Sequence, residues 1–148
     1  ALDELTSGYR EDPSDQVKLF RSKCDSMVVT RGISFTSLCA HHVLPYWGKA
    51  VFGYIPDGVI LGLSKFSRIL RCFSRRLTTQ EDLVESVSEF LYSRLHPKGL
   101  GVVLKAVHTC AALRGVEDEG MEMVTSSMKG CFRESQSTRD EFLKMVVL

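Results

Sequence analysis

Cysteine and histidine side chains gather at two places in this sequence. Cys39, His41 and His42 fall within four positions, and His108 and Cys110 lie two positions apart much later in the chain. Thiolate sulfur and imidazole nitrogen are the ligands that zinc prefers in proteins. If the two segments meet, three protein ligands would leave the fourth position of a zinc ion open to water, as in catalytic sites. Histidines that do not bind the metal could then transfer protons.

The other three cysteines need no such role. Cys24, Cys72 and Cys131 are widely spread, and an isolated cysteine is most often a small buried or surface thiol. An odd total of five cysteines fits a reducing compartment better than a disulfide scaffold. We therefore expect a cytoplasmic protein.

A group of basic and hydroxyl-bearing residues could bind an anionic substrate. The group comprises Ser64, Lys65, Arg68 and Arg114. The first three open a predicted helix, where free backbone N–H groups and the helix dipole favour an anion such as phosphate. A basic helix face is more often only solvated surface. Next to this group, Gln80 and Glu81 offer an amide and a carboxylate that suit the N–H edge of a purine, although two exposed polar residues are the plainer interpretation.

Seven predicted elements must position these residues. Residue types and hydrophobic spacing indicate strands over 27–36, 47–55, 100–113 and 124–132, and helices over 64–75, 79–95 and 137–147. Ser64, Thr79 and Thr138 are the predicted helix N-caps. The order ββααββα predicts an α+β fold with a largely antiparallel sheet. In a regular strand over 100–113, His108, Cys110 and Arg114 would share one face.

Length and composition favour one globular domain. The 148 residues are 44% hydrophobic and 25% charged, which excludes a disordered or coiled-coil chain. A net charge of +1 gives no electrostatic reason to expect a nucleic-acid partner, and the apolar runs are too short to suggest a membrane partner. We interpret residues 1–148 as a single domain, in which residues 1–25 are a linker and the end of a truncated N-terminal helical segment.

Several motifs, in order from about Ser26 to Lys144, resemble those of the GTP cyclohydrolase I family. They are Ser37-Leu-Cys-Ala-His-His42, Gly62-Leu-Ser-Lys65, Arg75-Arg-Leu-x-x-Gln-Glu81, His108-x-Cys110, Arg114-Gly115 and Phe132-Arg-Glu134. The resemblance implies the tunnel fold, in which four-stranded antiparallel sheets, with helices packed on one face, join into a ring barrel. Two five-membered rings would stack as a homodecamer, with the active sites between subunits.

The resemblance also implies a reaction and roles for the residues. The reaction is hydrolysis of GTP to 7,8-dihydroneopterin triphosphate and formate, the first step of pterin and folate biosynthesis. Zn²⁺ would be held by Cys39, His42 and Cys110, with His41 and His108 as the acid/base histidines. The substrate-binding residues would be Gln80 and Glu81 for guanine, and Ser64, Lys65, Arg68 and Arg114 for ribose and triphosphate.

Two other functions stay open at this point. Ala40 stands where the family usually has Glu, which allows an enzyme that acts on a related purine nucleotide or stops at the ring-opened formamide. A non-catalytic member could instead keep zinc and assembly and regulate an active paralogue. Retention of His41, His108 and Glu81 argues against that second alternative, since a scaffold has no use for a proton donor beside an open metal position.

Overall fold

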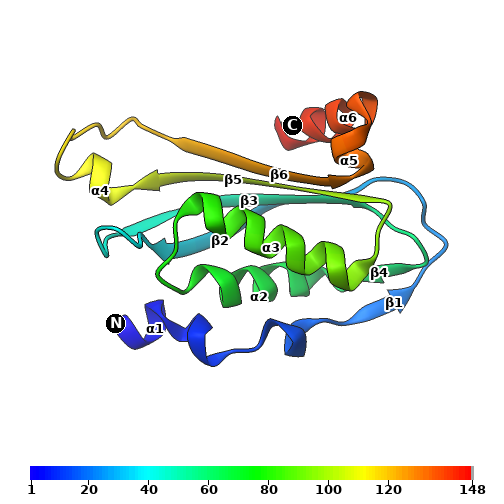
Figure 1. Cartoon of the computed structure of the whole chain (residues 1–148), viewed down its shortest axis with the longest axis horizontal. Helices are drawn as coiled ribbons and strands as arrows, with labels where there is room; N and C mark the ends of the chain where they lie inside the picture. The colour runs from blue at the N-terminus through cyan, green and yellow to red at the C-terminus, as the bar shows by residue number, and fades with distance from the viewer. Residues whose placement is uncertain (148) are drawn as a thin grey trace.

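A four-stranded antiparallel sheet forms the centre of the molecule in the computed structural model, which describes residues 1–147 (Figure 1). Its spatial order is β2-β3-β5-β6, with β2 at Val28–Leu38, β3 at Pro45–Ile55, β5 at Gly99–His108 and β6 at Met123–Gly130. A separate two-stranded ribbon pairs β1 (Leu19–Arg21) with β4 (Val59–Leu61). The predicted α+β class, with an antiparallel sheet, is confirmed.

Two long helices cover one face of this sheet. They are α2 (Leu63–Ser74) and α3 (Gln80–Leu95), and their apolar stripes bury Phe66, Ile69, Val87 and Leu91 against alternate side chains of β3 and β5. Because side chains of a strand alternate between faces, Ala50, Phe52, Val102 and Leu104 all point to this face. They form part of the main core. The N-terminal segment holds α1 (Leu2–Leu5) and 3₁₀ turns at Ser7–Arg10 and Pro13–Gln16.

The prediction that all helices pack on one face is wrong. The short helix α5 (Cys131–Glu134) and the terminal helix α6 (Gln136–Val147) lie on the opposite face at one end of the sheet (Figure 1). Phe132 and Phe142, both fully buried, pack there against Val51 and Val103. Gly101 makes room for this packing, because a Cβ at that position would lie 2.7 Å from the ring of Phe142.

One strand ends earlier in the structure than the sequence predicts. The strand predicted over 100–113 stops at His108, and residues Thr109–Ala112 form a helical turn, α4. The Thr109 hydroxyl donates a hydrogen bond to the carbonyl oxygen of Pro45 (2.7 Å), which fixes the start of that turn beside β3. Cys110 therefore lies on a helical turn and not on a strand.

Of the three predicted helix caps, one is confirmed. The Thr79 hydroxyl accepts a hydrogen bond from the Asp82 N–H at the start of α3. Helix α2 begins earlier than predicted, with Gly62 as its N-cap in place of Ser64. At α6 it is Ser135, not Thr138, whose hydroxyl accepts a bond from a first-turn N–H, that of Thr138. Within residues 1–147 no helix has the length and apolar character needed to cross a bilayer.

Candidate metal centre and active site

The loop that joins β2 to β3 holds the first two predicted metal ligands close together. Leu38 and Pro45 are the last paired residues of the two strands. The backbone closes on itself at Cys39, whose N–H donates to Leu44 and whose carbonyl accepts from Val43, both at 2.8 Å. This tight turn brings Cys39 Sγ to 3.8 Å from Nδ1 of His42. Cys39 is buried and His42 is exposed.

The third predicted ligand, Cys110, follows β5, the strand that pairs with β3 on the side away from β2. Register pairing of Tyr46 with His108 brings the end of β5 beside the start of β3, and α4 then carries Cys110 to the loop. The ligand atoms of Cys39, His42 and Cys110 all lie within 4.8 Å of one another. Around a tetrahedral zinc ion, neighbouring ligand atoms would be about 3.6 to 3.8 Å apart. The ligand atoms would therefore have to approach one another by about 1 Å at most to complete the set.

The electrostatics of the three residues also suit a cation. Burial, and then the neighbouring Cys39, raise the pKa of the Cys110 thiol. A positive charge placed between the two sulfur atoms would offset this effect on Cys110. The donor atoms, their spacing and their electrostatics all fit a soft divalent metal.

His108 lies beside these ligands and is held by two neighbours. Its ring stacks on Tyr46, with centroids 4.3 Å apart and planes 7° from parallel. Tyr46 is itself fixed, because its hydroxyl donates to the carbonyl oxygen of Thr78 (2.8 Å). Burial is the main reason that the pKa of Tyr46 rises to about 12, so the phenol stays protonated. The second neighbour is Gln80, whose Oε1 lies 2.7 Å from Nε2 of His108.

The Gln80 side chain determines which nitrogen of His108 carries a proton. Gln80 is 1% exposed, and its amide nitrogen donates to the carbonyl oxygens of Leu104 (3.2 Å) and Met123 (3.0 Å). Those acceptors orient the amide so that its oxygen faces the imidazole. Since an amide oxygen only accepts, Nε2 of His108 must donate, and neutral His108 keeps its lone pair on Nδ1.

The other predicted acid/base and guanine-binding residues lie on exposed surfaces near this centre. His41 is in the β2–β3 loop, with its ring centroid 6.3 Å from that of His42. Glu81 is exposed in the first turn of α3. Burial lowers the pKa of His108, and the negative charge of Glu81 opposes that shift, which shows that Glu81 acts on the same imidazole.

The predicted phosphate-binding residues separate into two places. Arg114 is on the metal side, where its guanidinium donates to the carbonyl oxygen of Cys110 (3.3 Å). Ser64, Lys65 and Arg68 begin α2 near β4, at the opposite end of the sheet from α4 (Figure 1). At 1.5 Å per residue, α2 separates Ser64 from its own last turn by about 15 Å. One chain does not bring these three residues to the metal ligands.

Sequence reasoning missed two residues that position the centre. Tyr46 was not singled out, although it stacks on His108, and Thr109 was treated only as the spacer between His108 and Cys110. Neither carries a motif of its own. The available signal was the strand register, because aligning 45–55 against 99–108 places Tyr46 opposite His108.

Comparisons with known proteins show which family this chain is similar to. The family model described as GTP cyclohydrolase I matches residues 1–147. The chain is 46% identical to GTP cyclohydrolase 1 of Chlorobium phaeovibrioides over 96% of its own length and 65% of that protein. It is 47% identical to GTP cyclohydrolase 1 of Synechococcus sp. (strain JA-3-3Ab) over 99% of its length and 65% of that protein. For GTP cyclohydrolase 1 of Coxiella burnetii the values are 43% identity, 99% and 80%.

A solved structure shares the fold at low sequence identity. It is the archaeosine synthase QueF-Like in the apo form, with a TM-score of 0.61 and 19% identity over 73% of this chain and 97% of that one. The family match, which spans nearly all of the chain, and the relatives at 43 to 47% identity lead to one assignment. This chain belongs to the GTP cyclohydrolase I family.

Proposed function

We propose that this protein hydrolyses GTP to 7,8-dihydroneopterin triphosphate and formate, with zinc as its metal, as an early step of pterin biosynthesis in the cytoplasm. The observation that carries the proposal is the meeting of Cys39, His42 and Cys110 directly beside a histidine whose proton positions are fixed. Family membership supports the same reaction. The chain spans about two thirds of the Chlorobium relative, so activity of the whole protein belongs to the proposal.

Cys39, His42 and Cys110 would hold the metal and leave a fourth position for water or substrate. Zinc bound there would supply a Lewis acid at the carbon of the purine five-membered ring that is hydrolysed. Two thiolates and one imidazole balance most of the ion's charge and match its preference for soft ligands. The exposure of His42 keeps one side of the centre open to a substrate.

His108 is the proposed proton donor to the leaving ring nitrogen. Its Nε2–H is committed to Gln80, so Nδ1 would first accept the proton that the attacking water releases and then donate it to the leaving ring nitrogen. Stacking on Tyr46 fixes the plane of the ring and therefore the direction of Nδ1. His41, on the exposed loop, is the second acid/base group and would act at the ribose ring oxygen.

Glu81 is the proposed anchor of guanine. A carboxylate can accept hydrogen bonds from both N1–H and the 2-amino group of guanine, and adenine offers neither donor. Gln80 does not share this role, because its amide is buried and already bonded to His108 and to two backbone carbonyls. We assign Gln80 to positioning His108 instead.

The separation of Ser64, Lys65 and Arg68 from the metal ligands favours a site completed by a second copy of the chain. The two outer strands, β2 and β6, leave sheet edges that another copy could pair with. A ring of such sheets, stacked in pairs as a homodecamer, would bring the start of α2 of one copy to the metal end of its neighbour. Arg114 already lies at that end and would bind the same triphosphate.

The test is to incubate the zinc-loaded protein with GTP and to follow formate release and pterin fluorescence together. We expect both products, and discrimination against ATP of about 10⁴-fold, because adenine leaves the carboxylate of Glu81 unpaired. Glu81→Gln should reduce GTP turnover strongly without changing the zinc content. Glu141→Gln, an exposed acidic residue on α6, is the matched control and should behave as the unchanged protein.

Three other results of this assay would each favour a different function. Formate without pterin would indicate an enzyme that stops after ring opening. Comparable turnover of ATP would overturn the guanine anchor. Zinc binding with no turnover of GTP would favour a non-catalytic partner of an active paralogue.

A further inference from the structure

A short segment near the start of the chain packs against the end of α2. Ser7–Arg10 form a 3₁₀ turn, which we call the N-terminal turn (Figure 1). The N–H of Gly8 donates to the carbonyl oxygen of Arg75 (3.0 Å), which α2 itself leaves without a partner. This approach requires glycine, because a Cβ on Gly8 would lie 2.3 Å from the carbonyl oxygen of Cys72. The N-terminal turn therefore caps α2 where the α2–α3 loop, residues 76–79, begins.

Two side chains join the N-terminal turn to this loop. The guanidinium of Arg76 donates to the carbonyl oxygen of Gly8 (3.1 Å) and lies 5.7 Å from the ring centroid of Tyr9, within reach of a cation–π contact. The hydroxyl of Tyr9 accepts a hydrogen bond from the N–H of Leu77 (3.0 Å). One side chain of the loop and one of the turn thus each bond to the other segment.

Packing alone does not fix the outer side of the loop. Leu77 is 42% exposed, and an open pocket of about 250 Å³ lies between the loop and α3, with Arg76 and Leu83 among its lining residues. On the inner side, the backbone of the loop bonds to the backbone of Leu38 at the end of β2. The N-terminal turn therefore supplies hydrogen bonds on the side of the loop that β2 does not reach.

The loop in turn holds the ring that stacks on His108. The carbonyl oxygen of Thr78 accepts a hydrogen bond from the hydroxyl of Tyr46 (2.8 Å), and Tyr46 is fully buried. The hydroxyl of Ser37, a further polar neighbour of Tyr46, donates to the carbonyl oxygen of Arg76 in the same loop (3.2 Å). A buried phenol follows its acceptor, because an unpaired buried hydroxyl is costly. A displacement of the loop should therefore tilt Tyr46 and, with it, the ring of His108.

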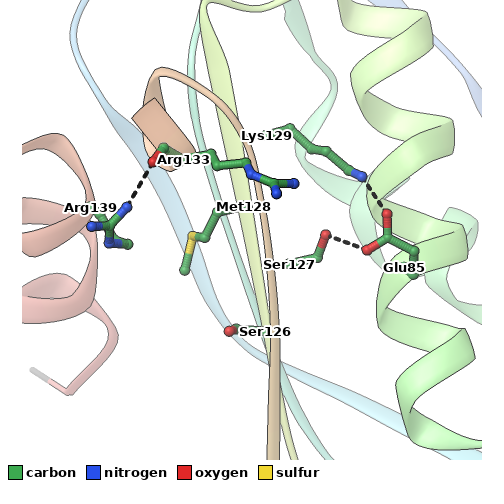
Figure 2. Close-up of a pocket in the computed structure, with 7 residues that line it drawn as sticks. All are labelled: Glu85, Ser126, Ser127, Met128, Lys129, Arg133 and Arg139. Atoms are coloured by element: carbon green, nitrogen blue, oxygen red, sulfur yellow. Dashed lines mark hydrogen bonds and ion pairs between the residues drawn. The ribbon is translucent and has the colours of Figure 1, made fainter. Parts of the chain in front are cut away.

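Figure 2 shows a contact of the same kind in another part of the molecule. The guanidinium of Arg139 donates to the backbone carbonyl oxygens of Phe132 (3.3 Å) and Arg133 (2.9 Å) and so ties α6 to α5. These helices cover the opposite face of the sheet from α2 and α3. Loss of this contact should lower stability without moving His108, so Arg139 is a matched control for Arg76.

We propose that Arg76 is a positioning residue for His108, acting from the N-terminal turn through Thr78 and Tyr46. The stack on Tyr46 sets the direction of Nδ1, and a shift of about 1 Å at a reacting group can cost about 100-fold in rate. The role in turnover rests on the proposed function, in which His108 moves a proton. The geometric link from Arg76 to His108 does not, and it can be measured without substrate.

Proton NMR of the zinc-loaded full chain with isotope-labelled histidine measures that link. The ring current of Tyr46 displaces the signals of the His108 ring protons, so these signals report the stack. Spectra are recorded at a pH at which the imidazole is neutral in every variant. Arg76→Met should move the signals toward those of an unstacked histidine, and Arg139→Met should leave them in place. Tyr9→Phe, which removes only one hydroxyl, should move them less.

A second variant displaces the N-terminal turn without changing Arg76. Gly8→Ala places a methyl group against the backbone of α2, and it should move the His108 signals in the same direction. Gly120→Ala is the matched control, because a Cβ on Gly120 would meet its nearest atom, on Asp118, at 3.7 Å.

Kinetics show whether this position matters for turnover. In Arg76→Met, kcat for GTP per folded, zinc-loaded chain should fall about 10- to 100-fold. KM should change little, because Arg76 lies outside the proposed substrate contacts. Arg139→Met should keep both constants.

The proposal is wrong if the His108 signals stay in place in folded Arg76→Met and Gly8→Ala, or if Arg139→Met moves them equally. It is also wrong if the signals move while kcat stays the same. A chain that turns over no GTP, but whose His108 signals respond to Arg76→Met, would contradict the proposed function instead and support the geometric link.

Discussion

The two ends of the sheet are built by different means. At the metal end, Tyr46, Gln80 and Thr109 are buried polar side chains that each bond to a backbone carbonyl of another segment. At the far end, Phe132 and Phe142 pack edge to face, with centroids 5.2 Å apart. Aromatic burial stabilises without fixing direction, whereas hydrogen bonds fix direction with a smaller net gain.

The difference indicates where stability and precision reside. At the far end, the apolar side chains of Phe132 and Phe142 cover one face of the sheet and have no reactive groups. The metal end places its ligands through residues that are not themselves ligands, since Thr109 anchors the turn that carries Cys110. Substitutions at the far end should therefore change unfolding most, and those at the metal end should change metal binding and turnover most.

The largest stability effect is expected at Phe142. Phe142→Ala would remove a fully buried ring that contacts Phe132 and covers Gly53 and Gly101, at a cost of about 3–5 kcal/mol. Denaturant unfolding measures it. The protein that remains folded should keep its zinc. A loss below about 1 kcal/mol would show that α6 is not part of the core.

An intermediate effect is expected at Gln80. Gln80→Leu keeps most of the volume but removes the bonds from the Gln80 amide to two backbone carbonyls and to His108, which should cost about 1–3 kcal/mol. Turnover of GTP should fall well beyond what the loss of folded protein explains. Gln136→Leu is the matched control, because Gln136 is also the first residue of a helix but is exposed. Equal turnover in the two variants would contradict the positioning role.

A smaller effect on stability is expected at Thr109. Thr109→Val removes one hydroxyl from a buried site and leaves the Pro45 carbonyl without that bond, at about 0.5–1.5 kcal/mol. Zinc affinity should fall as well, because α4 carries Cys110. Competition with a chelator measures the affinity. Unchanged zinc affinity would contradict the claim that the Thr109 hydrogen bond positions Cys110 for the metal.

The smallest effect is expected for the exposed ion pair at the far end. The hydrogen bond from Lys129 is the main cause that lowers the pKa of Glu85, whose side chain is 48% exposed. A carboxyl group whose pKa is lower in the folded state stabilises the fold at pH values above its unfolded pKa. This stabilisation is lost as the pH falls through its folded pKa. Glu85→Gln should therefore cost about 0.5 kcal/mol or less near neutral pH, with the difference vanishing in acid. Unfolding curves across that pH range test it.

Local patterns predicted much of the fold. Hydrophobic spacing located α2 and α3 to within a few residues, and Thr79 signalled the start of α3 correctly. The side of the sheet that α6 covers depends on Gly53 and Gly101, which meet Phe142 only after the strands pair. No pattern local to α6 could have given that outcome.

The candidate site divides in the same way. Residue type and spacing predicted a metal site among the clustered cysteines and histidines, and the family resemblance implied the set Cys39, His42 and Cys110. The structure brings these three together. The contact of Gln80 with His108 could not be predicted, because it depends on α3 beginning over the end of β5. The same long-range geometry placed Ser64, Lys65 and Arg68 away from the metal ligands, which sequence spacing does not encode.

The zinc content of the unchanged protein and of Cys110→Ser, purified side by side, tests the central claim most directly. We predict one zinc per chain in the unchanged protein and a large loss in the variant, with the folded fraction and helix content equal in both. Cys24 lies outside the three-residue cluster, so the Cys24→Ser variant should keep its zinc. Stoichiometric zinc in Cys110→Ser, or none in the unchanged protein, would contradict a metal centre formed by Cys39, His42 and Cys110.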